Sequence, residues 1–268
     1  MNLMEGKTGL IMGVANEKSI AWGIANQLFL NKANIILTYQ NESLKKRVEP
    51  LSHKIKSKSL YRCDVSVDKI EEYSIENLFK NIKQDVGKID FVVHALAFSD
   101  KEELKGRYLE TSRTNFLNTL DISAYSFTRV SRSASQLMQN GGSLLTLTYL
   151  GSNRTTPNYN VMGVAKAALE TSVKYLSADL GKRNIRVNAI SAGPMKTLAG
   201  AAISGARHVY RYSEKIAPLN ENPNLEQVGN AALYLLSDIS SGVTGLTHYV
   251  DGGLRVVGIP DQNKVDTL

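Results

Sequence analysis

The sequence predicts an α/β protein built as a single doubly wound domain, with a parallel seven-stranded sheet and helices on both faces. Short apolar runs rich in β-branched residues alternate along the chain with longer segments of helical periodicity, which is the pattern of βαβ units. No stretch rich in proline, glycine or serine divides the 268 residues, so we expect one domain over residues 1–268. This is a Rossmann-type arrangement, in which ligands bind beyond the carboxyl ends of the strands.

The predicted strands and helices alternate from one end of the chain to the other. Strands are expected near residues 7–12, 34–39, 59–63, 89–94, 143–148, 185–190 and 246–250. Helices are expected near residues 20–31, 42–55, 70–86, 113–139, 158–181 and 225–237. Each helical segment is too long for a strand, and most begin after Ser, Asn or Asp or end near Gly or Asn. Right-handed crossovers then place helices on both faces.

Composition and charge narrow the class of protein. Hydrophobic residues make up 43% and charged residues 21% of the chain, as in ordinary folded proteins. The net charge of +7 suits a nucleic acid, a membrane surface or an acidic protein. Basic residues form only short clusters, such as the one at 45–47 that Glu49 and Pro50 follow, so we expect no nucleic acid.

The sequence lacks the features of membrane-spanning, secreted and disulfide-bonded proteins. No run approaches the roughly 20 apolar residues of a membrane span, so we expect no integral membrane segment. The N-terminal residues do not resemble a secretory signal. The single cysteine, Cys63, rules out an intrachain disulfide and is interpreted as a packing residue. We therefore expect a cytoplasmic protein, and no metal in its site.

A glycine turn follows the first predicted strand. Gly13 ends that strand, and Ser19 and Ile20 open the next helix. A helix N-terminus offers unpaired N–H donors and a positive dipole end to a pyrophosphate, and glycine lets the phosphate approach the backbone. The usual G-x-G-x-x-G spacing is absent. The alternative, an ordinary turn glycine with Ser19 as a helix cap, stays open here.

The next two predicted strands end in polar residues that suit an adenosine. Gln40 ends the second strand, where an acid would bind the ribose hydroxyls and a base would accept a 2′-phosphate. Because Gln40 is neutral and the nearby lysines fall on the following helix, we expect NADH in preference to NADPH. Asp64 can accept from the adenine amino group, with Val65 donating through its backbone; a turn cap is the alternative role for Asp64.

Two tyrosines and a lysine follow the fifth predicted strand. Tyr149 stands at the carboxyl end of the strand, and Tyr159 lies near the start of a helix that carries Lys166. Seven helical residues turn through about 700°, so Tyr159 and Lys166 share one stripe roughly 10 Å apart. Lys166 can hold a ribose and favour ionisation of a phenol, Tyr159 can donate to a carbonyl oxygen, and Gly163 leaves the ligand room. A capping tyrosine and an exposed lysine are the alternative.

Residues 195–215 depart from the alternating pattern. This segment is rich in small residues and follows a Gly193-Pro194 break after a strand. A mobile flap over the site and a short surface helix pair both fit such a composition, and we expect a substrate-binding flap at about residues 195–215 that closes over the site and excludes water.

Four motifs in order resemble the short-chain dehydrogenase/reductase superfamily. They are Gly13 to Gly23 with Ser19-Ile20-Ala21, then residues 158–167 with Tyr159 and Lys166, then residues 186–194, and finally Val250-Asp251-Gly252-Gly253. The widely spaced first turn and the Tyr-x6-Lys arrangement are similar to those of bacterial NADH-dependent enoyl-acyl-carrier-protein reductases. This resemblance covers essentially the whole chain.

The resemblance implies a role for individual residues. Tyr149 and Tyr159 match the two active-site tyrosines of that family, Lys166 its ribose-binding lysine, and Ser99 a position close to the substrate. The implied cofactor-binding residues are Gly13, Ser19, Ile20, Gln40, Asp64, Val65, Leu96, Met195, Lys196, Thr197, Leu198 and Ala199. The family often has His-Ser-Ile-Gly where this chain has 94–97, and alanine at the position of Ser99, which leaves the shape of the acyl pocket open.

The implied activity is reduction of the trans-2 double bond of enoyl-acyl-carrier-protein thioesters by NADH, in the elongation cycle of fatty acid biosynthesis. The implied partner is acyl carrier protein, and the implied assembly is a homotetramer. The alternative within the superfamily is a 3-ketoacyl or other carbonyl reductase. A cofactor-binding protein without catalysis, or a basic nucleic-acid binder, is the alternative of another class.

Overall fold

The computed structural model of the chain describes residues 2–67, 71–201 and 203–265. Its centre is a parallel sheet of seven strands, as predicted, and the strands follow one another in the order β3-β2-β1-β4-β5-β6-β7. The strands are β1 (Thr8–Met12), β2 (Asn34–Tyr39), β3 (Ser59–Arg62), β4 (Phe91–His94), β5 (Gly142–Thr148), β6 (Ile185–Ala192) and β7 (Thr247–Val250). Every neighbouring pair is parallel, with Leu10 opposite both Ile36 and Val92 in the register of β1.

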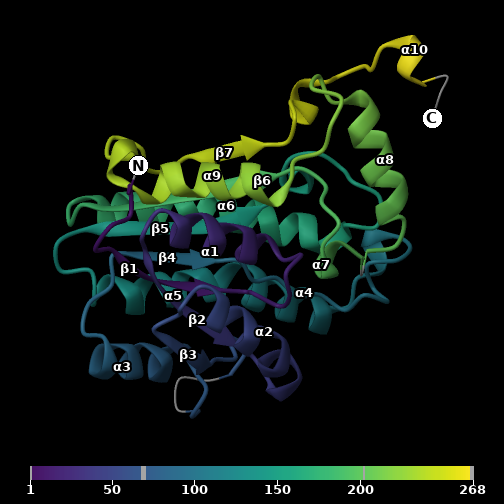
Figure 1. Cartoon of the computed structure of the whole chain (residues 1–268). Coiled ribbons are helices and arrows are strands. Elements are labelled where there is room, and N and C mark those ends of the chain that lie inside the picture. The colour runs from purple at the N-terminus through teal and green to yellow at the C-terminus, as the bar shows by residue number, and fades with distance from the viewer. Residues whose placement is uncertain (1, 68–70, 202, 266–268) are drawn as a thin grey trace.

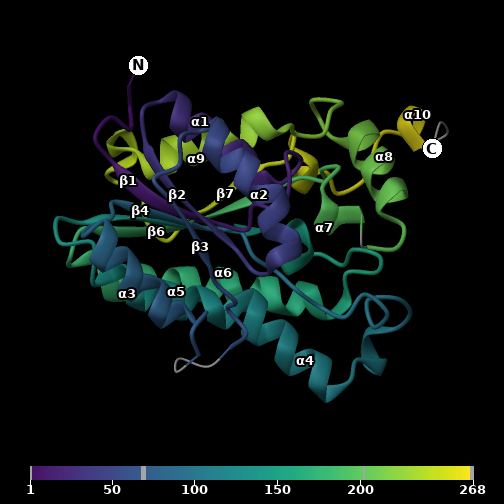
Figure 2. The ribbon, with the colours of Figure 1, turned by 60° about the horizontal axis from the view of Figure 1, so that its bottom comes forward.

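Helices cover the two faces of the sheet as two layers (Figures 1 and 2). The layer on one face contains α1 (Ile20–Leu30), α2 (Glu42–Lys54) and α9 (Leu225–Leu236). The layer on the other face contains α3 (Ile75–Asp85), α4 (Arg113–Leu120), α5 (Ser126–Ser135) and α6 (Asn160–Gly181). The chain therefore has the three-layer architecture that a doubly wound sheet requires.

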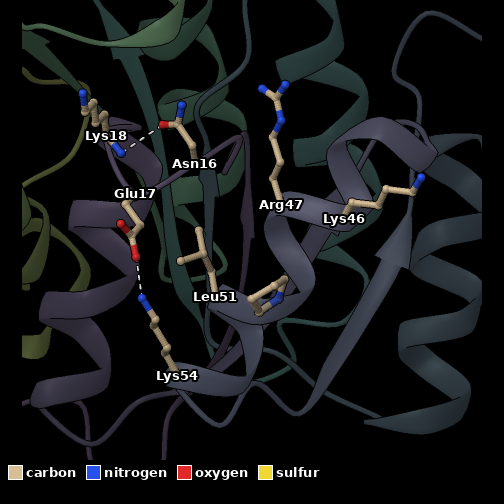
Figure 3. Close-up of a pocket in the computed structure, with 8 residues that line it drawn as sticks. Asn16, Glu17, Lys18, Lys46, Arg47, Leu51 and Lys54 are labelled. Atoms are coloured by element: carbon tan, nitrogen blue, oxygen red, sulfur yellow. Dashed lines mark hydrogen bonds and ion pairs between the residues drawn. The ribbon is translucent and has the colours of Figure 1, made fainter.

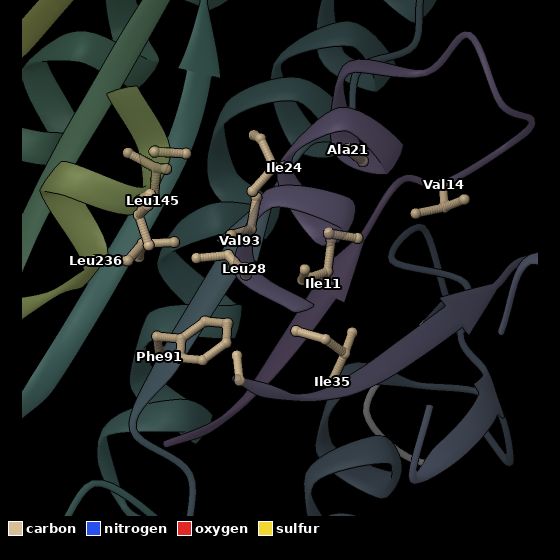
Figure 4. Packing of buried hydrophobic residues seen from close by; sticks show 14 of the residues in the cluster. Ile11, Val14, Ala21, Ile24, Leu28, Ile35, Phe91, Val93, Leu145 and Leu236 are labelled. Atoms are coloured by element: carbon tan, nitrogen blue, oxygen red, sulfur yellow. The ribbon is translucent and has the colours of Figure 1, made fainter. Parts of the chain in front are cut away.

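Separate hydrophobic cores fill the spaces between the sheet and each helical layer. Figure 4 shows Ile24 and Leu28 of α1 packed over Ile11 and Phe91 of the strands. Alternate residues along each strand face the other layer: Leu10 belongs to the second core and Ile11 to the first. Cys63 is buried in the second core, where burial raises the pKa of its thiol to about 12, so it packs as a small apolar residue.

The predicted helices differ from the observed ones mainly at their ends. The segment predicted as one helix over 113–139 is α4 and α5 joined by a π-helical turn, η2 (Asp121–Tyr125). The helix predicted from residue 70 begins at Ile75, where the Ser74 hydroxyl accepts from the Asn77 N–H; residue 70 itself lies outside the described residues. A cap of this kind sets the first turn more strongly than apolar periodicity does.

Three further helices and several short 3₁₀ turns lie in the described part of the chain. Residues 195–215 contain α7 (Leu198–Ala201) and most of α8 (Ala206–Ile216), which stand together near the carboxyl ends of the strands (Figure 1). The last described element is α10 (Gln262–Val265). The 3₁₀ turns are η1 (Tyr108–Glu110), η3 (Leu150–Ser152), η4 (Asp238–Ser240) and η5 (Leu254–Val256). No helix in the described part of the chain has the length and apolar character needed to cross a membrane.

Candidate active site and cofactor-binding edge

The two predicted active-site tyrosines are in contact beyond the end of β5. Tyr149 directly follows this strand, and Tyr159 occupies the N-cap position of α6. Their ring centroids are 5.0 Å apart, with 65° between the ring planes, which is an edge-to-face arrangement. Tyr159 is buried with Val161 and Met162. Its side chain makes no capping hydrogen bond, so helix capping does not account for this tyrosine.

Two glycines let the Tyr159 ring and α6 come close to η3. A Cβ on Gly151 would lie 2.4 Å from the Tyr159 ring, and a Cβ on Gly163 would lie 2.6 Å from the Gly151 carbonyl oxygen. The prediction that Gly163 leaves room for a ligand is therefore wrong. The space beside this glycine is filled by the backbone of η3, because the loop after Tyr149 folds back onto the helix.

Asparagines with left-handed backbone bracket Tyr159. Asn158 has a φ of 57° and Asn160 a φ of 38°. The amide of Asn160 donates to the Leu104 carbonyl at 3.1 Å, and that of Asn158 donates to the Ser204 carbonyl at 2.9 Å. Asparagine tolerates this backbone region better than most residues. The start of α6 is thus tied to the loop before α4 and to the segment between α7 and α8.

Lys166 is buried rather than exposed on its helix. Only 6% of its surface is exposed, and its Nζ donates to the Leu147 carbonyl oxygen of β5 at 2.7 Å. Burial lowers the pKa of Lys166 to about 8, although the Glu170 carboxylate acts in the opposite direction. The alternative of a lysine on the solvent-exposed face of α6 is excluded.

The tyrosine phenols keep their protons. Burial raises the pKa of Tyr159 far above its ordinary value, and Tyr149 and the Glu170 carboxylate raise it further. Burial also raises the pKa of Tyr149, more than a hydrogen bond with Thr156 lowers it. The expectation that Lys166 favours ionisation of the phenol is wrong for this structure. A protonated Tyr159 can act as a hydrogen-bond donor to a carbonyl oxygen.

Sequence reasoning missed a carboxylate on the same helix as Lys166. The Thr148 hydroxyl donates to Glu170 Oε1 at 2.6 Å, which fixes the carboxylate against the last residue of β5. The signal for it was the i, i+4 spacing of Lys166 and Glu170, which places both side chains on one face of a helix.

A fully buried histidine lies below the site and was not predicted to contribute. His94, the last residue of β4, has its Nε2 2.8 Å from the Ser126 hydroxyl and its Nδ1 3.3 Å from the Thr146 hydroxyl. Burial lowers the pKa of His94 to about 3, and the charge of Lys166 adds to the effect. The imidazole is therefore neutral and joins β4, β5 and α5.

The predicted phosphate-binding turn has a defined local structure. Gly13 has a φ of 102°, and a Cβ there would lie 2.1 Å from the Ala95 carbonyl oxygen, so this position requires glycine. The Ser19 hydroxyl accepts from the N–H groups of Ala15 and Asn16, both at 3.0 Å, and caps no helix turn. Ile20 is the first residue of α1. Ser19 thus shapes the loop that precedes the helix N-terminus.

The structure brings the predicted adenosine residues together at the ends of β2 and β3. Gln40 donates to Asp64 Oδ2 at 3.0 Å, and Asp64 Oδ1 accepts from both the N–H and the hydroxyl of Ser66. Asp64 therefore also caps this turn, which is the alternative role that the sequence left open for it. Partial burial raises the pKa of this carboxyl, but the hydrogen bonds outweigh it and lower the pKa overall. The Val65 carbonyl accepts from Arg129, which sequence reasoning also missed.

Leu96 and Ser99 lie on the chain that leaves β4. Leu96 packs against the second core. Ser99 is held by α4: its hydroxyl lies within 3.2 Å of the Asn115 amide, and the Thr119 hydroxyl donates to it at 2.9 Å. Ser99 is therefore positioned by the polar side chains of α4.

The segment predicted as a flap or a helix pair contains two helices, α7 and α8, and its role as a flap stays a prediction. Met195 packs against the first core, and the Lys196 ammonium lies 4.5 Å from the centroid of the Tyr210 ring. Thr197 accepts from the Gly200 N–H at 2.9 Å, and Leu198 and Ala199 begin α7. Between the helices, Ile203 packs against the cluster that contains Tyr159. The segment therefore touches the tyrosine site.

A surface hollow of about 460 Å³ lies beside the glycine turn (Figure 3). It separates residues 16–18 from α2 and is lined by Lys18, Lys46 and Arg47 among others, while Glu17 forms an ion pair with Lys54. None of the residues lining this hollow belongs to the cluster of Tyr149, Tyr159 and Lys166. Within the described ranges, no group of His, Cys, Asp and Glu side chains is arranged to hold a metal ion.

Comparison with known proteins identifies the family. Residues 13–255 match the family model described as enoyl-(acyl carrier protein) reductase. The chain is 57% identical to enoyl-[acyl-carrier-protein] reductase [NADH] 1 of Rhizobium meliloti, over 96% of the chain and 93% of the relative. It is 52% identical to enoyl-[acyl-carrier-protein] reductase [NADH] FabI of Rickettsia typhi, over 96% and 97%.

Solved structures agree in fold. The enoyl-(acyl-carrier-protein) reductase of Anaplasma phagocytophilum, in complex with NAD, is 54% identical, with a TM-score of 0.92 over 97% of each chain. FabI of Candidatus Liberibacter asiaticus is 51% identical, with a TM-score of 0.94 over 97% of this chain and all of that one. Sequence, family model and fold agree over nearly the whole length, and the chain belongs to the enoyl-(acyl carrier protein) reductase family.

Proposed function

We propose that the chain reduces the trans-2 double bond of enoyl-acyl-carrier-protein thioesters with NADH, as a step of fatty acid elongation. The observation that carries this proposal is the contact between the buried Tyr159 ring and the partly buried Tyr149 ring beyond the carboxyl end of β5, where Lys166 of α6 also donates to the Leu147 carbonyl of that strand. The names of relatives at 52–57% identity support the reaction and the cofactor. A hydride acceptor that ends as an enolate needs a donor near a carbonyl oxygen, and Tyr159 is such a donor.

The residues along the sheet edge fit a dinucleotide. The Gly13 turn and the N-terminus of α1 suit the pyrophosphate, with Ser19 and Ile20 beside it. Gln40 and Asp64 are already hydrogen-bonded to each other where the adenosine would lie, and Val65 follows. The remaining cofactor contacts are assigned to Leu96, Lys166, and Met195 to Ala199. NADH, when bound, supplies the hydride; the chain supplies position and charge.

Tyr159 and Lys166 are assigned different tasks. The raised pKa of Tyr159 keeps its phenol protonated, so it donates to the thioester oxygen as negative charge develops there. The Lys166 ammonium donates to the Leu147 carbonyl in this structure. We assign it to the ribose hydroxyls of the nicotinamide half, where its charge also contributes a positive field. Tyr149 shapes the pocket or assists protonation at the α-carbon, and Ser99 lies close to the substrate.

The positive surface near the site suits an acidic carrier protein. On α8, Arg207, Arg211 and Lys215 recur every four residues and so share one helix face. With His208 they line a surface hollow of about 740 Å³ next to the segment that packs on the tyrosine cluster. We assign this face to acyl carrier protein, and α7 with its flanking residues to a flap that closes over the acyl chain.

Assembly and location complete the proposal. We expect a homotetramer, as the family resemblance implies, and a cytoplasmic location, which the single cysteine suits. Size-exclusion chromatography with light scattering on the purified chain, of mass 29.4 kDa, checks the assembly: a particle of about four chain masses is expected, and a monomer contradicts it.

The reaction is tested with purified protein, NADH and two thioesters. Loss of nicotinamide absorbance with crotonyl thioester is expected, at a rate that falls sharply for Tyr159→Phe and Lys166→Ala. The same assay with a 3-ketoacyl thioester examines the alternative. Turnover of the ketoacyl substrate alone would favour the carbonyl reductase, and turnover of neither would contradict both.

A further inference from the structure

Glu170 is the carboxylate nearest in sequence to Lys166 on α6, one helical turn towards the C-terminus. Residues four apart on a helix have Cβ atoms roughly 5–6 Å apart on the same face. Glu170 is only partly buried, whereas Lys166 is buried among apolar and backbone groups. The two side chains form no direct ion pair in the described structure, and the charge of the carboxylate raises the pKa of Lys166 across the space between them.

The carboxylate has a fixed position. The Thr148 hydroxyl, itself only 5% exposed, donates to Glu170 Oε1 at 2.6 Å. The residue before Thr148 provides the carbonyl that accepts from Lys166 Nζ at 2.7 Å. Consecutive residues of β5 therefore hold the ammonium and the carboxylate. A rigid strand fixes both ends of the interaction, which a freely rotating surface glutamate could not do.

We propose that Glu170, held by the Thr148 hydroxyl, is a positioning residue that keeps the buried Lys166 amine protonated and therefore able to bind the cofactor's ribose. A buried ammonium far from any anion loses its proton readily, because the charged form is poorly solvated. A fixed carboxylate one turn away opposes that loss. The inference rests on the proposed function, since it assigns Lys166 to the ribose.

The other titratable groups around Lys166 do not supply this negative charge. His94 of β4 is neutral and fully buried. Tyr149 after β5 and Tyr159 at the start of α6 are phenols that burial keeps protonated. Burial lowers the pKa of Lys166 to about 8, and Glu170 is the group that raises it. Glu170 is therefore the group around Lys166 that favours the protonated amine.

Removal of the Glu170 carboxylate shifts the pH dependence of NADH binding to lower pH. Without the carboxylate, the pKa of Lys166 falls further, so the amine loses its proton at a lower pH. NADH binding then weakens at a lower pH than in the wild type, while binding well below the pKa is unchanged. A shift of one pKa unit corresponds to about a tenfold change in the protonation equilibrium.

The experiment measures the dissociation constant of NADH between pH 6 and 9 by quenching of the single tryptophan, Trp22 of α1. For Glu170→Gln we expect a dissociation constant about three- to tenfold above wild type at pH 8.5, and within about twofold at pH 6.5. Thr148→Val should shift the plot of the dissociation constant against pH in the same direction. Thr148→Ser keeps the hydroxyl and should give the wild-type pH dependence. Glu226→Gln, an exposed carboxylate on α9, is the control for loss of one charge.

The outcomes separate this inference from the proposed function. Melting temperatures establish that each variant is folded, and Thr148→Val and Glu170→Gln test the interaction from its two sides. Equal weakening at every pH, or a curve that superimposes on the wild type, would overturn the role of Glu170. Lys166→Ala should abolish the pH dependence; if it keeps the wild-type curve, the assignment of Lys166 to the ribose fails as well.

Discussion

The ring of Tyr149 lies edge-on to the ring of Tyr159, with 5.0 Å between their centroids, and both phenols are protonated. Only Tyr159 is part of the buried cluster at the start of α6. We therefore expect Tyr159→Phe to lower kcat by about 10²- to 10⁴-fold, the range for loss of a positioned proton donor. The dissociation constant of NADH, measured by Trp22 quenching, should stay within about twofold because the ring is retained.

The partner tyrosine provides the matched comparison. Tyr149→Phe keeps the edge-to-face contact and removes one hydroxyl, so we expect a smaller loss of kcat, within about tenfold, with KM for the thioester raised. Steady-state kinetics with crotonyl thioester distinguish the two variants. Equal losses of kcat would mean that the hydroxyls share one role, contrary to the assignment.

Packing of α6 against η3 predicts a stability effect. Gly163→Ala places a methyl group 2.6 Å from the Gly151 carbonyl, so we expect a loss of about 1–3 kcal/mol in the free energy of unfolding. At Gly181, the other end of α6, an added methyl group would have no atom within 4 Å, so Gly181→Ala should be neutral or stabilise by up to about 1 kcal/mol. Urea denaturation of both variants measures the difference. Similar midpoints would contradict the close packing.

The buried histidine predicts a pH dependence of stability. The pKa of His94 is about 3 in the folded chain against an ordinary value of 6.5, mainly because the imidazole is buried. Between these values the unfolded chain binds a proton that the folded chain does not, so stability falls as pH falls. From pH 7 to pH 5 this group should remove about 2 kcal/mol. In urea titrations, His94→Gln should make the free energy of unfolding less dependent on pH between 5 and 7. An unchanged pH dependence would contradict the lowered pKa of His94.

Cofactor choice should depend on Gln40. Its amide donates to Asp64 Oδ2, and this neutral and acidic pair offers no cation to a 2′-phosphate. Gln40→Arg should therefore improve kcat/KM for NADPH and lower it for NADH, because a guanidinium attracts the phosphate. The ratio of the two kcat/KM values measures the effect. An unchanged ratio would place the adenosine ribose elsewhere.

The sequence was sufficient for the sheet, whereas the roles of the site residues stay predictions. Most strand runs are apolar and largely buried, so their composition and length located the seven strands of the described sheet, with ends at most two residues out. The order of Tyr149, Tyr159 and Lys166 along the chain also placed them at one edge, because parallel strands end together. The helices within residues 195–215 were not predictable, since small residues suit both a loop and a short helix.

The contacts that position the site were not predictable from spacing. Gly163 was expected to leave room for a ligand, yet the Gly151 carbonyl occupies that space. The pairing of Thr148 with Glu170, and of Arg129 with the Val65 carbonyl, joins residues 22 and 64 positions apart. Such pairings depend on how helices rest on the sheet, and one sequence carries no direct signal for them.

The proposed reaction is tested by locating the hydride of NADH in the product. Purified protein is given crotonyl thioester and NADH deuterated at the 4-position of the nicotinamide, and the product is analysed by mass spectrometry and NMR. If the chain reduces enoyl thioesters, the product is a saturated acyl thioester with one deuterium at the β-carbon. A deuterated 3-hydroxy product from a ketoacyl thioester, with no reduction of the crotonyl group, would contradict it.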